Sequence, residues 1–463
     1  MAERDLTKGP IWRALAAVSA PMSLGIFGVL SVGLADAYFL GQLGEAPLAA
    51  VGYIYPVTTA ITSLAIGLSA GANATVSQAL GRGSPDHNRL SLHAIGLGLS
   101  LAILVAIGFY FFAGDLFSLM GAGPDALTEA KSYVPLWALS FPCLVTMMVV
   151  NAVFRAHGDG ATSAAIMVLA AVVNIALNPL FIFGWGPIPQ LGTEGAALAT
   201  FIGRLAAVVV AVWYAFYSGA LCWPDKLLPD LWASTKQILN VGVPAAFSNA
   251  INPAGMALVT AAVATIGDAA VAGFGAATRV QSMVLVALFA LSAGIGPVVG
   301  QNWGADQPDR ARRGLAVSWL FCVGYGVAIA VVLFFFADPI AALLADDGQA
   351  AQYAAQYLQI VGFSLFGYGV LVTTNAAMNA RSKALYSTGL SLARIFICYV
   401  PLAWVGVMLF GYIGILVAAV VANVFAVAGA YWCAAKTGLL PDSWPAPPAL
   451  SLNSVEKAKN AIS

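Results

Sequence analysis

The chain has 463 residues, of which 60% are hydrophobic and 9% are charged, and its 20 basic and 20 acidic residues balance to zero net charge. A soluble domain carries about 25% charged residues, so this composition predicts an integral membrane protein in contact with the lipid bilayer. The balanced charge gives no indication of nucleic-acid binding. The five cysteines contain no CxxC pair, and with three histidines a metal cluster is not expected.

Apolar stretches of membrane-spanning length follow one another along the chain. A transmembrane helix needs about 20 predominantly apolar residues, and windows of that size predict an all-α fold of twelve transmembrane helices. The first stretch is too long for the hydrophobic region of a secretory signal, so we expect it to stay in the membrane. The expected spans are residues 12–41, 47–79, 90–113, 132–154, 162–184, 194–218, 237–265, 270–302, 313–337, 353–380, 386–409 and 411–435.

The basic residues alternate between successive loops. The N-terminus and every second loop carry Lys or Arg, as at Arg82, Arg155 and Arg310, whereas the other loops carry almost none, Lys131 being the exception. Loops rich in Lys and Arg stay on the cytoplasmic side of a membrane. We therefore expect a multi-pass protein of the cytoplasmic (inner) membrane with both termini in the cytoplasm.

The two halves of the chain match at a constant offset of 223 residues, which pairs Pro21 with Pro244 and Gln78 with Gln301. Each half holds six spans, so both enter the membrane in the same direction, as in two-lobed secondary transporters. Two such lobes could rock around a central cavity to alternate access. The expected division is an N-terminal lobe at 1–218, a cytoplasmic linker at 219–236, a C-terminal lobe at 237–436 and a disordered cytoplasmic tail at 437–463.

Asp36 is the only carboxylate deep inside any of the expected spans. A charged side chain in hydrocarbon costs roughly 2.5–3.5 kcal/mol on insertion scales, so it tends to face the protein interior or a water-filled cavity. Asp36 could be a titratable or cation-binding group on a transport path, or a structural hydrogen-bond acceptor between helices. Its counterpart in the second half is Val259, so only the first half carries the acid, which favours the functional role.

Several short motifs lie in a fixed order between residues 10 and 435: Pro21, Leu34–Asp36 with Leu43–Gly44, Gly67–Gly81, Phe154–Asp159, Asn174–Pro179 and Gly195–Thr200. Their order resembles that of the multidrug and toxic compound extrusion (MATE) family, nearest to its DinF-like branch. The resemblance implies two pseudo-symmetric six-helix lobes. It also implies a secondary active antiporter that exports small organic cations and amphipathic compounds, such as drugs or toxins, in exchange for protons or sodium ions.

The resemblance further implies which residues bind the coupling ion: Asp36, Asn151, Asn174, Asn178 and Thr200. Many relatives have a second aspartate at the position of Asn178, so Asp36 is left as a single carboxylate. Asn174 and Asn178 are four residues apart and share one helix face, from which their amides could donate to Asp36. Packing between helices is the alternative role for this pair.

Candidate substrate-binding residues lie in both halves. Aromatic side chains could line an apolar cavity for flat cations, opposite polar side chains of the second half. Three arginines inside apolar spans, Arg204, Arg279 and Arg394, could bind an anion or could pair within the structure. The residues expected at the cavity are Phe27, Tyr38, Tyr53, Phe154, Asn249, Asn252 and Arg279.

Three mechanisms fit these features. The leading hypothesis is a proton-coupled antiporter in which Asp36 takes up the proton, and the second is sodium coupling through the same cluster. The third is a lipid-linked oligosaccharide flippase, which would need the three arginines to converge on one cavity. No phosphate-binding loop or HExxH motif is present, so we expect a monomeric transporter that is not an enzyme and uses no cofactor besides its coupling ion.

Overall fold

The computed structural model describes residues 5–187, 189–344, 348–441, 443 and 444. Within these ranges the regular elements are helices, which agrees with the all-α prediction, and most of the expected tail lies outside them. The elements are α1 (Ile11–Gly41), α2 (Glu45–Gly81), α3 (His87–Leu119), α4 (Pro124–Ala156), α5 (Gly160–Phe183), α6 (Gly192–Tyr217), α7 (Leu231–Ala264), α8 (Asp268–Val284), α9 (Val286–Gly304), α10 (Pro308–Leu344), α11 (Gly348–Val361), η1 (Gly362–Ser364), α12 (Leu365–Ala380), α13 (Ala384–Leu392), η2 (Ala393–Tyr399) and α14 (Val400–Lys436).

The predicted number of membrane crossings depends on two irregular helices. Ten helices of the described chain are long and apolar enough to cross a membrane, and the pair α8 and α9, bent by 42°, makes up to eleven. The span from Ala384 to Lys436 has 53 residues, which is too long for one crossing. It is interrupted at Gly411, whose φ of 60° and ψ of −139° are not helical. Counting its two parts separately gives twelve crossings, as predicted.

Small residues allow the reversal at Gly411. Gly406 and Gly414, on either side of it, pack so closely that a Cβ on either one would overlap the other's backbone. The two parts of α14 therefore lie side by side as a hairpin, and only glycine readily adopts the positive φ at its tip. The predicted boundary between spans 386–409 and 411–435 falls at this turn.

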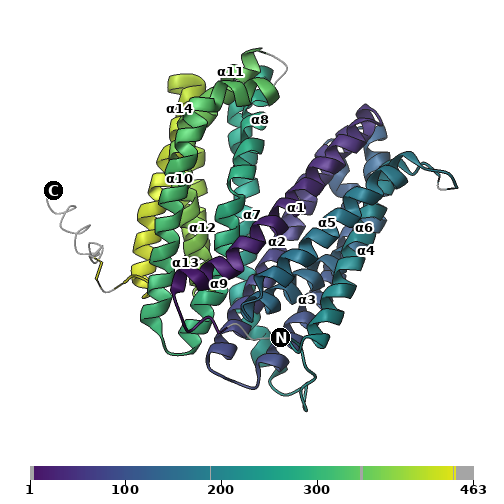
Figure 1. Cartoon of the computed structure of the whole chain (residues 1–463). Coiled ribbons are helices and arrows are strands. Elements are labelled where there is room, and N and C mark those ends of the chain that lie inside the picture. Colours follow the sequence, from purple (N-terminus) through teal and green to yellow (C-terminus); the bar gives the residue numbers. More distant parts are fainter. Residues whose placement is uncertain (1–4, 188, 345–347, 442, 445–463) are drawn as a thin grey trace, which may run out of the picture.

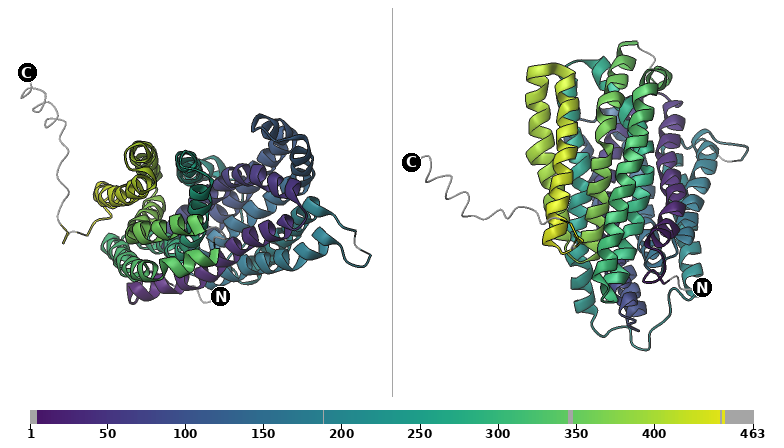
Figure 2. Two further views of the ribbon diagram at one scale, coloured as in Figure 1. Left: turned by 90° about the horizontal axis from the view of Figure 1, so that it is seen from above. Right: turned by 60° about the vertical axis from the view of Figure 1, so that its left-hand side comes forward.

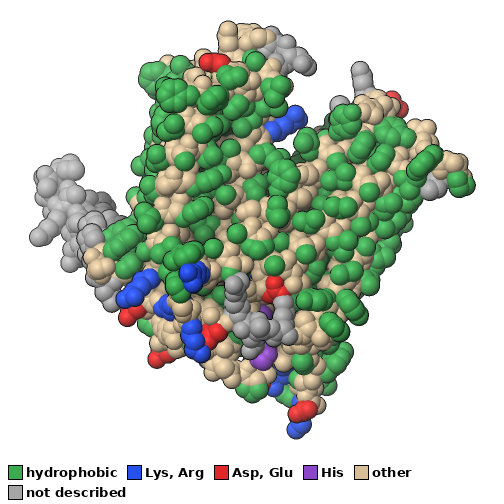
Figure 3. All heavy atoms as spheres, viewed as in Figure 1, with side chains coloured by type: hydrophobic (Ala, Val, Ile, Leu, Met, Phe, Trp, Pro, Cys, Tyr) green, Lys and Arg blue, Asp and Glu red, His purple; other side chains and the backbone are tan. Residues whose placement is uncertain are grey.

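The helices form two lobes that meet at one end and diverge at the other (Figure 1). The N-lobe comprises α1 to α6, and the C-lobe comprises α7 to α14. One helix is central in each lobe: α4 packs against α2, α3 and α6, and α12 packs against α9, α10 and α14. On the face seen in Figure 3, apolar side chains cover both lobes, which suits contact with lipid.

The two ends of the molecule differ in charge. Lys and Arg side chains gather at the end where the lobes meet (Figure 3), here called the basic end. It holds the N-terminus and the connections α2–α3, α4–α5, α6–α7, α9–α10 and α12–α13. At the other end, here called the open end, the surface is hollowed between the lobes (Figure 3).

The first helix of the N-lobe reaches into the C-lobe. Seen from above, α1 begins beside the C-lobe helices and ends among those of the N-lobe (Figure 2). Leu6, Leu15 and Val18 belong to the hydrophobic core of the C-lobe, whereas Gly25 packs against Ala164 of α5. The segment around Leu6 and the first part of α1 therefore pack against the C-lobe, while the later part of α1 packs within the N-lobe. Likewise α7 begins at Leu231, inside the expected 219–236 linker.

Two equivalent hydrogen bonds join the lobes at the basic end. Gln78 of α2 donates its Nε2 to the carbonyl oxygen of Ala380 at 2.6 Å. Gln301 of α9 donates its Nε2 to the carbonyl oxygen of Ala156 at 2.6 Å. The repeat pairs these two glutamines, so the same bond is made once in each direction. The pseudo-symmetry of the sequence therefore continues into the contact between the lobes.

Close helix packing supports these bonds. A Cβ on Gly81 would overlap the carbonyl oxygen of Gln301, and a Cβ on Gly304 would overlap that of Gln78. The N-terminal segment adds a strap across the same end. Leu6 donates its amide to Gln301 Oε1 at 3.0 Å. Together with the two glutamine bonds and the close glycine packing, this contact shows that the described structure is closed at the basic end.

Candidate functional site

Asp36 lies five residues before the end of α1, near the open end, and is half-buried. Its Oδ1 accepts a hydrogen bond from Asn178 Nδ2 at 2.6 Å. Asn178 is fully buried on α5, and its own Oδ1 has no partner among the described residues. The predicted contact between the acid of the first helix and the asparagine of the fifth is therefore present.

The hydrogen bonds continue from α5 to α6. Asn174 lies one turn before Asn178 and accepts from its Nδ2 at 3.4 Å. Asn174 Nδ2 donates to Thr200 Oγ1 at 3.0 Å, and the Thr200 hydroxyl donates to the Ala196 carbonyl at 3.0 Å. Gly203 permits this approach, because a Cβ there would lie 2.8 Å from the Ala170 carbonyl oxygen. We call Asp36, Asn178, Asn174 and Thr200 the acid cluster.

A basic and an aromatic side chain stand close to the acid cluster. Arg204 of α6 interacts electrostatically with Asp36 but forms no ion pair with it. Its Nη1 donates to Ser140 Oγ at 2.7 Å, and its guanidinium lies 5.6 Å from the centre of the Trp137 ring. Tyr133 packs against the buried residues Leu40, Ile182 and Ala196 beside the acid cluster. Sequence reasoning left Arg204 unassigned and missed Tyr133, which carries no pattern that would single it out.

Asn151 does not join the acid cluster. It lies five residues before the end of α4, which is at the basic end, whereas Asp36 lies near the open end. It is buried, and its Oδ1 has no hydrogen-bond partner among the described residues. Four of the five expected coupling residues are therefore brought together, and the fifth lies apart from them, towards the basic end.

The aromatic residues expected to line one cavity do not share one environment in the structure. Phe27 and Tyr38 are exposed, at 53% and 64%. Tyr53 donates its hydroxyl to the Gly121 carbonyl at 3.2 Å. Phe154 is fully buried in the N-lobe core beside Tyr214. Its expected place on a cavity wall is wrong, because its position on the central helix α4 surrounds it with other helices.

In the C-lobe, the polar residues fall into two groups. Asn249 donates to the Ala245 carbonyl of its own helix at 2.8 Å, and Arg279 is exposed on α8. Asn252, by contrast, accepts from Arg394 Nη1 at 3.2 Å through its Oδ1. Asn252 therefore belongs to a second buried network, centred on an arginine.

Arg394 is 8% exposed and has amide oxygens as its acceptors. Its Nε and Nη2 both donate to Asn423 Oδ1, at 3.2 and 2.9 Å. Its guanidinium lies 4.9 Å from the centre of the Tyr368 ring, whose hydroxyl accepts from Asn252 Nδ2 at 2.9 Å. We call Arg394, Asn423, Asn252 and Tyr368 the arginine cluster. Sequence reasoning noted Arg394 and Asn252 separately but missed Tyr368 and Asn423.

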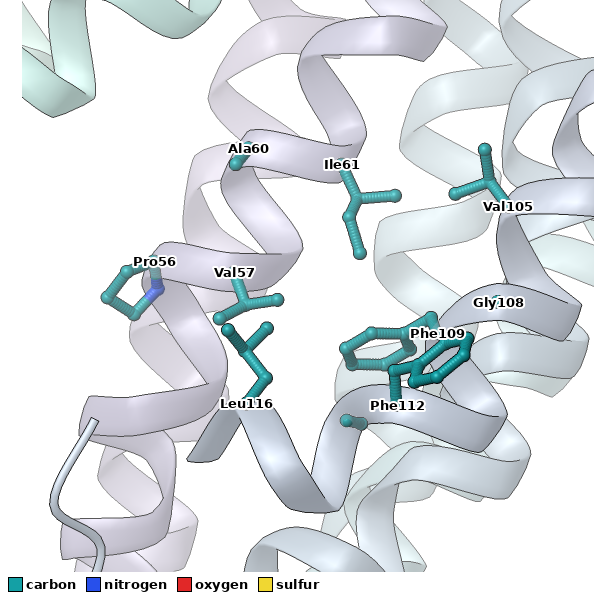
Figure 4. A pocket seen from close by; sticks show the side chains of 10 residues that line it. Pro56, Val57, Ala60, Ile61, Val105, Gly108, Phe109, Phe112 and Leu116 are labelled. Atoms are coloured by element: carbon teal, nitrogen blue, oxygen red, sulfur yellow. The ribbon is translucent and has the colours of Figure 1, made fainter. Parts of the chain in front are cut away.

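A lateral groove lies apart from both clusters. It has a volume of about 550 Å³ and lies between α2 and α3 of the N-lobe (Figure 4). Pro56, Ile61, Phe109 and Phe112 are among its lining residues, all of which are apolar or glycine. It therefore offers no ligand to an ion, and its lining suits a lipid acyl chain. Among the described residues, no group of three or more His, Cys, Asp or Glu could hold a metal ion.

Comparison with known proteins identifies the family to which this architecture belongs. The MatE family model matches residues 21–180 and 244–405, one segment in each half. An FAD transporter of Shewanella oneidensis is 34% identical over 434 residues, covering 93% of this chain and 96% of that protein. A probable multidrug resistance protein NorM of Thermotoga maritima is 25% identical over 390 residues, covering 82% of each chain.

Solved structures show the same fold. The Vibrio cholerae MATE transporter VcmN in its bent form has a TM-score of 0.87 and 27% identity, covering 92% of this chain and 96% of that one. An outward-facing multidrug resistance MATE transporter has a TM-score of 0.89 at 23% identity, covering 94% of this chain and 98% of that one. At that identity the second match shows the fold alone.

Proposed function

Because this chain belongs to the MATE family of membrane transporters, we propose that it exports its substrate in exchange for protons and that Asp36 binds the coupling proton. The observation that carries this proposal is the hydrogen bond from Asn178 to Asp36. It joins the single carboxylate of the cluster to a side chain that can either donate or accept.

An asparagine partner suits both protonation states of Asp36. The ionised carboxylate accepts from Asn178 Nδ2, as described. A protonated carboxyl becomes a donor, and Asn178 Oδ1, which has no partner among the described residues, can accept from it after the amide turns over. The hydrogen bond between Asp36 and Asn178 can therefore be kept when the proton is gained or lost. That turn would also alter the contact with Asn174 and carry the change to α6.

Sodium coupling is less well supported by these contacts. A sodium site needs several oxygen ligands, but the acid cluster holds a single carboxylate, which in the described arrangement accepts from the Asn178 amide nitrogen. Asn174 Nδ2 donates to the Thr200 hydroxyl, so that oxygen is also engaged. Arg204 adds a positive charge nearby, which would oppose a bound cation. A proton needs no such set of ligands.

For alternating access, we propose that the basic end faces the cytoplasm, as the distribution of Lys and Arg predicts. The described structure would then be an outward-open state. Protonation of Asp36 at the open end would favour one arrangement of the N-lobe, and substrate binding would favour the other. The two ligands would thus oppose each other through a shared equilibrium.

Two substrate classes are in question. Organic cations and amphipathic compounds agree with the multidrug relatives. A specific observation favours a flavin nucleotide: the relative at 34% identity is an FAD transporter, and the C-lobe holds a buried arginine rather than an acid. The flippase hypothesis loses support, because Arg204 contacts Ser140 in the N-lobe while Arg394 contacts residues of the C-lobe.

The test uses purified protein in proteoliposomes. Addition of FAD or of ethidium to wild-type protein under an imposed proton gradient should release protons measurably, and Asp36→Asn should reduce this to the level of protein-free liposomes. Transport driven by a sodium gradient at equal pH on both sides would contradict proton coupling. Full proton exchange by Asp36→Asn would contradict the role of Asp36. Size-exclusion chromatography of both proteins controls for folding.

A further inference from the structure

The arginine cluster of the C-lobe contains a cation that lacks a balancing charge. Burying an ionised group without a partner of opposite charge is costly. Among the described residues, no carboxylate forms an ion pair with Arg394. Its guanidinium contacts the Tyr368 ring and the amide oxygens of Asn252 and Asn423. The protein therefore holds an arginine in an apolar lobe with neutral neighbours.

The hydrogen bonds of Arg394 leave donors free. A guanidinium has five N–H bonds. In the described structure three of them donate: Nε and Nη2 to Asn423, and Nη1 to Asn252. Five minus three leaves two N–H bonds, one on each terminal nitrogen. Two donors on adjacent nitrogens are the arrangement with which arginine binds two oxygens of a phosphate.

The backbone at this point is also unusual. Arg394 lies in η2 (Ala393–Tyr399), a π-helical turn between α13 and α14. Such turns are rare and are frequent at functional sites. They are less favourable than continuous α-helix, so a requirement for the position of a side chain is a reason to retain one. Here the turn carries the arginine.

Neutral polar groups continue from the arginine cluster towards the basic end. Ser248 lies one turn before Asn252 on α7, and its hydroxyl is 2.7 Å from that of Ser391. Asn375 Nδ2 donates to Ser391 Oγ at 3.0 Å, while its buried Oδ1 has no partner among the described residues. Hydroxyl and amide groups beside an arginine are the chemistry that binds a phosphate and its sugar.

The cluster is placed where the lobes have separated. Gly67 of α2 packs against Gly242 and Ala246 of α7. Asn252 lies six residues beyond Ala246, about 9 Å further along the helix towards the open end. The lobes diverge in that direction (Figure 1). Asn252 is half-buried, so one edge of the cluster is exposed in the part of α7 where the lobes diverge.

We propose that the arginine cluster is the subsite that binds a phosphate group of an exported flavin nucleotide, with Arg394 as its anion-binding residue. This rests on the proposed export function and names the substrate class. Arg394 would direct its two free N–H bonds to phosphate oxygens, while Asn252 and Asn423 keep the guanidinium in place. Tyr368 would stack beneath the guanidinium and limit its rotation.

The test is equilibrium binding, which is independent of any gradient. Flavin fluorescence is titrated with purified protein, using riboflavin, FMN and FAD as probes. FMN differs from riboflavin by one phosphate group. Wild-type protein should bind FMN and FAD at least tenfold more tightly than riboflavin, and Arg394→Gln should lose this preference while keeping its affinity for riboflavin.

Two further variants sharpen the outcome. Arg394→Lys should keep part of the preference, because it retains the charge but not the paired donors. Arg313→Gln, an exposed arginine near the start of α10, is the matched control and should keep the full preference. Equal affinity of wild-type protein for riboflavin and FMN, or an unchanged preference in Arg394→Gln, would overturn the proposal. So would loss of the preference in Arg313→Gln.

The binding test is separate from the transport test. If Asp36→Asn still exchanges protons but Arg394→Gln loses the phosphate preference, the coupling proposal fails and the subsite proposal stands. If Asp36→Asn loses coupling but Arg394→Gln binds FMN normally, the reverse holds. A monodisperse elution profile is required for each variant before its affinity is interpreted.

Discussion

The two lobes use corresponding helices to build polar clusters of opposite charge. In the N-lobe, the first, fifth and sixth helices supply Asp36, the asparagine pair and Thr200. In the C-lobe, the corresponding α7, η2 and second part of α14 supply Asn252, Arg394 and Asn423. Amide nitrogen faces the acid in one lobe, and amide oxygen faces the arginine in the other. Asparagine can serve both, because it carries a donor and an acceptor.

This comparison indicates how a duplicated fold can acquire two functions. The repeat fixes where the helices lie and therefore where buried polar groups can meet. The charge placed there is free to differ between the halves. A proton site and an anion site on opposite sides of one cavity would let each lobe bind its own ligand, with the contact at the basic end coupling them. Four predictions test this division, beginning with the largest expected effect.

Gly304→Val should abolish transport of every substrate. A side chain at Gly304 would overlap the Gln78 carbonyl oxygen, which belongs to a helix backbone and cannot move aside easily, so α2 and α9 must separate. Transport in proteoliposomes should fall to the level of protein-free liposomes. Gly324→Val on α10 is the matched control, because nothing lies within 4 Å of a Cβ there. Normal transport by the Gly304 variant would show that the basic end need not close tightly.

Asn178→Ala and Asn423→Ala should have complementary effects. Hydrogen bonds to charged groups contribute about 1.5–3 kcal/mol, or roughly 10–100-fold. Asn178→Ala removes the donor to Asp36 and should slow substrate-driven proton movement at least tenfold, but the preference for FMN over riboflavin should be unchanged. Asn423→Ala should weaken that preference, but the rate of proton movement should be unchanged. Loss of both properties in either variant would contradict separate sites in the two lobes.

Gln78→Ala and Gln301→Ala should have equal, moderate effects. Each removes one 2.6 Å bond between the lobes, and each also removes one longer bond, from Gln78 to Ser382 Oγ at 3.1 Å or from the Leu6 amide to Gln301 at 3.0 Å. The bond between the lobes contributes about 1 kcal/mol. Each variant should therefore shift the balance away from the closed basic end about fivefold, as measured by the reactivity of a cysteine introduced at that end. The double variant should show about the product of the two shifts. Strongly unequal single effects would show that the contact is not symmetric in energy.

Asp5→Asn should have the smallest effect. The Asp5 carboxylate accepts from Thr7 and pairs with Lys8 at 2.9 Å, and these contacts lower the pKa of Asp5 from 3.8 to about 2. Its contribution to stability is thus present above about pH 4 and is lost as the pH falls towards 2. Asp5→Asn should leave the pH profile of transport unchanged between pH 5 and 8. A changed profile there would assign part of the coupling to the strap.

Much of the fold could be predicted from hydropathy, because lipid requires every crossing to be an apolar helix. The boundary at Gly411 was also predictable, since the two spans on either side are each of membrane length. In the site, the spacing of Asn174 and Asn178 was sufficient to place both on one helix face, and the family resemblance implied that they share a site with Asp36. These successes depend on local geometry along one helix or on the known path of the chain.

The failures depend on depth and on packing. Asn151 is not part of the acid cluster because it lies only five residues before the end of α4 at the basic end. Counting 1.5 Å per residue from the following loop would have indicated this depth. Phe154 fails because α4 is central in its lobe, and hydropathy does not distinguish a helix surrounded by protein from one that faces lipid. The arginine cluster joins residues of four helices, so no pattern within one span could have identified it.

The burial of Leu6 in the C-lobe core has a consequence for folding during synthesis. Leu6 is 1% exposed, and its amide meets Gln301, a residue 295 positions later. During synthesis the segment around Leu6 must wait, without its partner surface, until most of the second half has been inserted. Contacts between such distant residues slow folding, and unpaired apolar segments invite misassembly in the meantime. The C-lobe core is therefore completed by a segment that is synthesised well before the rest of that core.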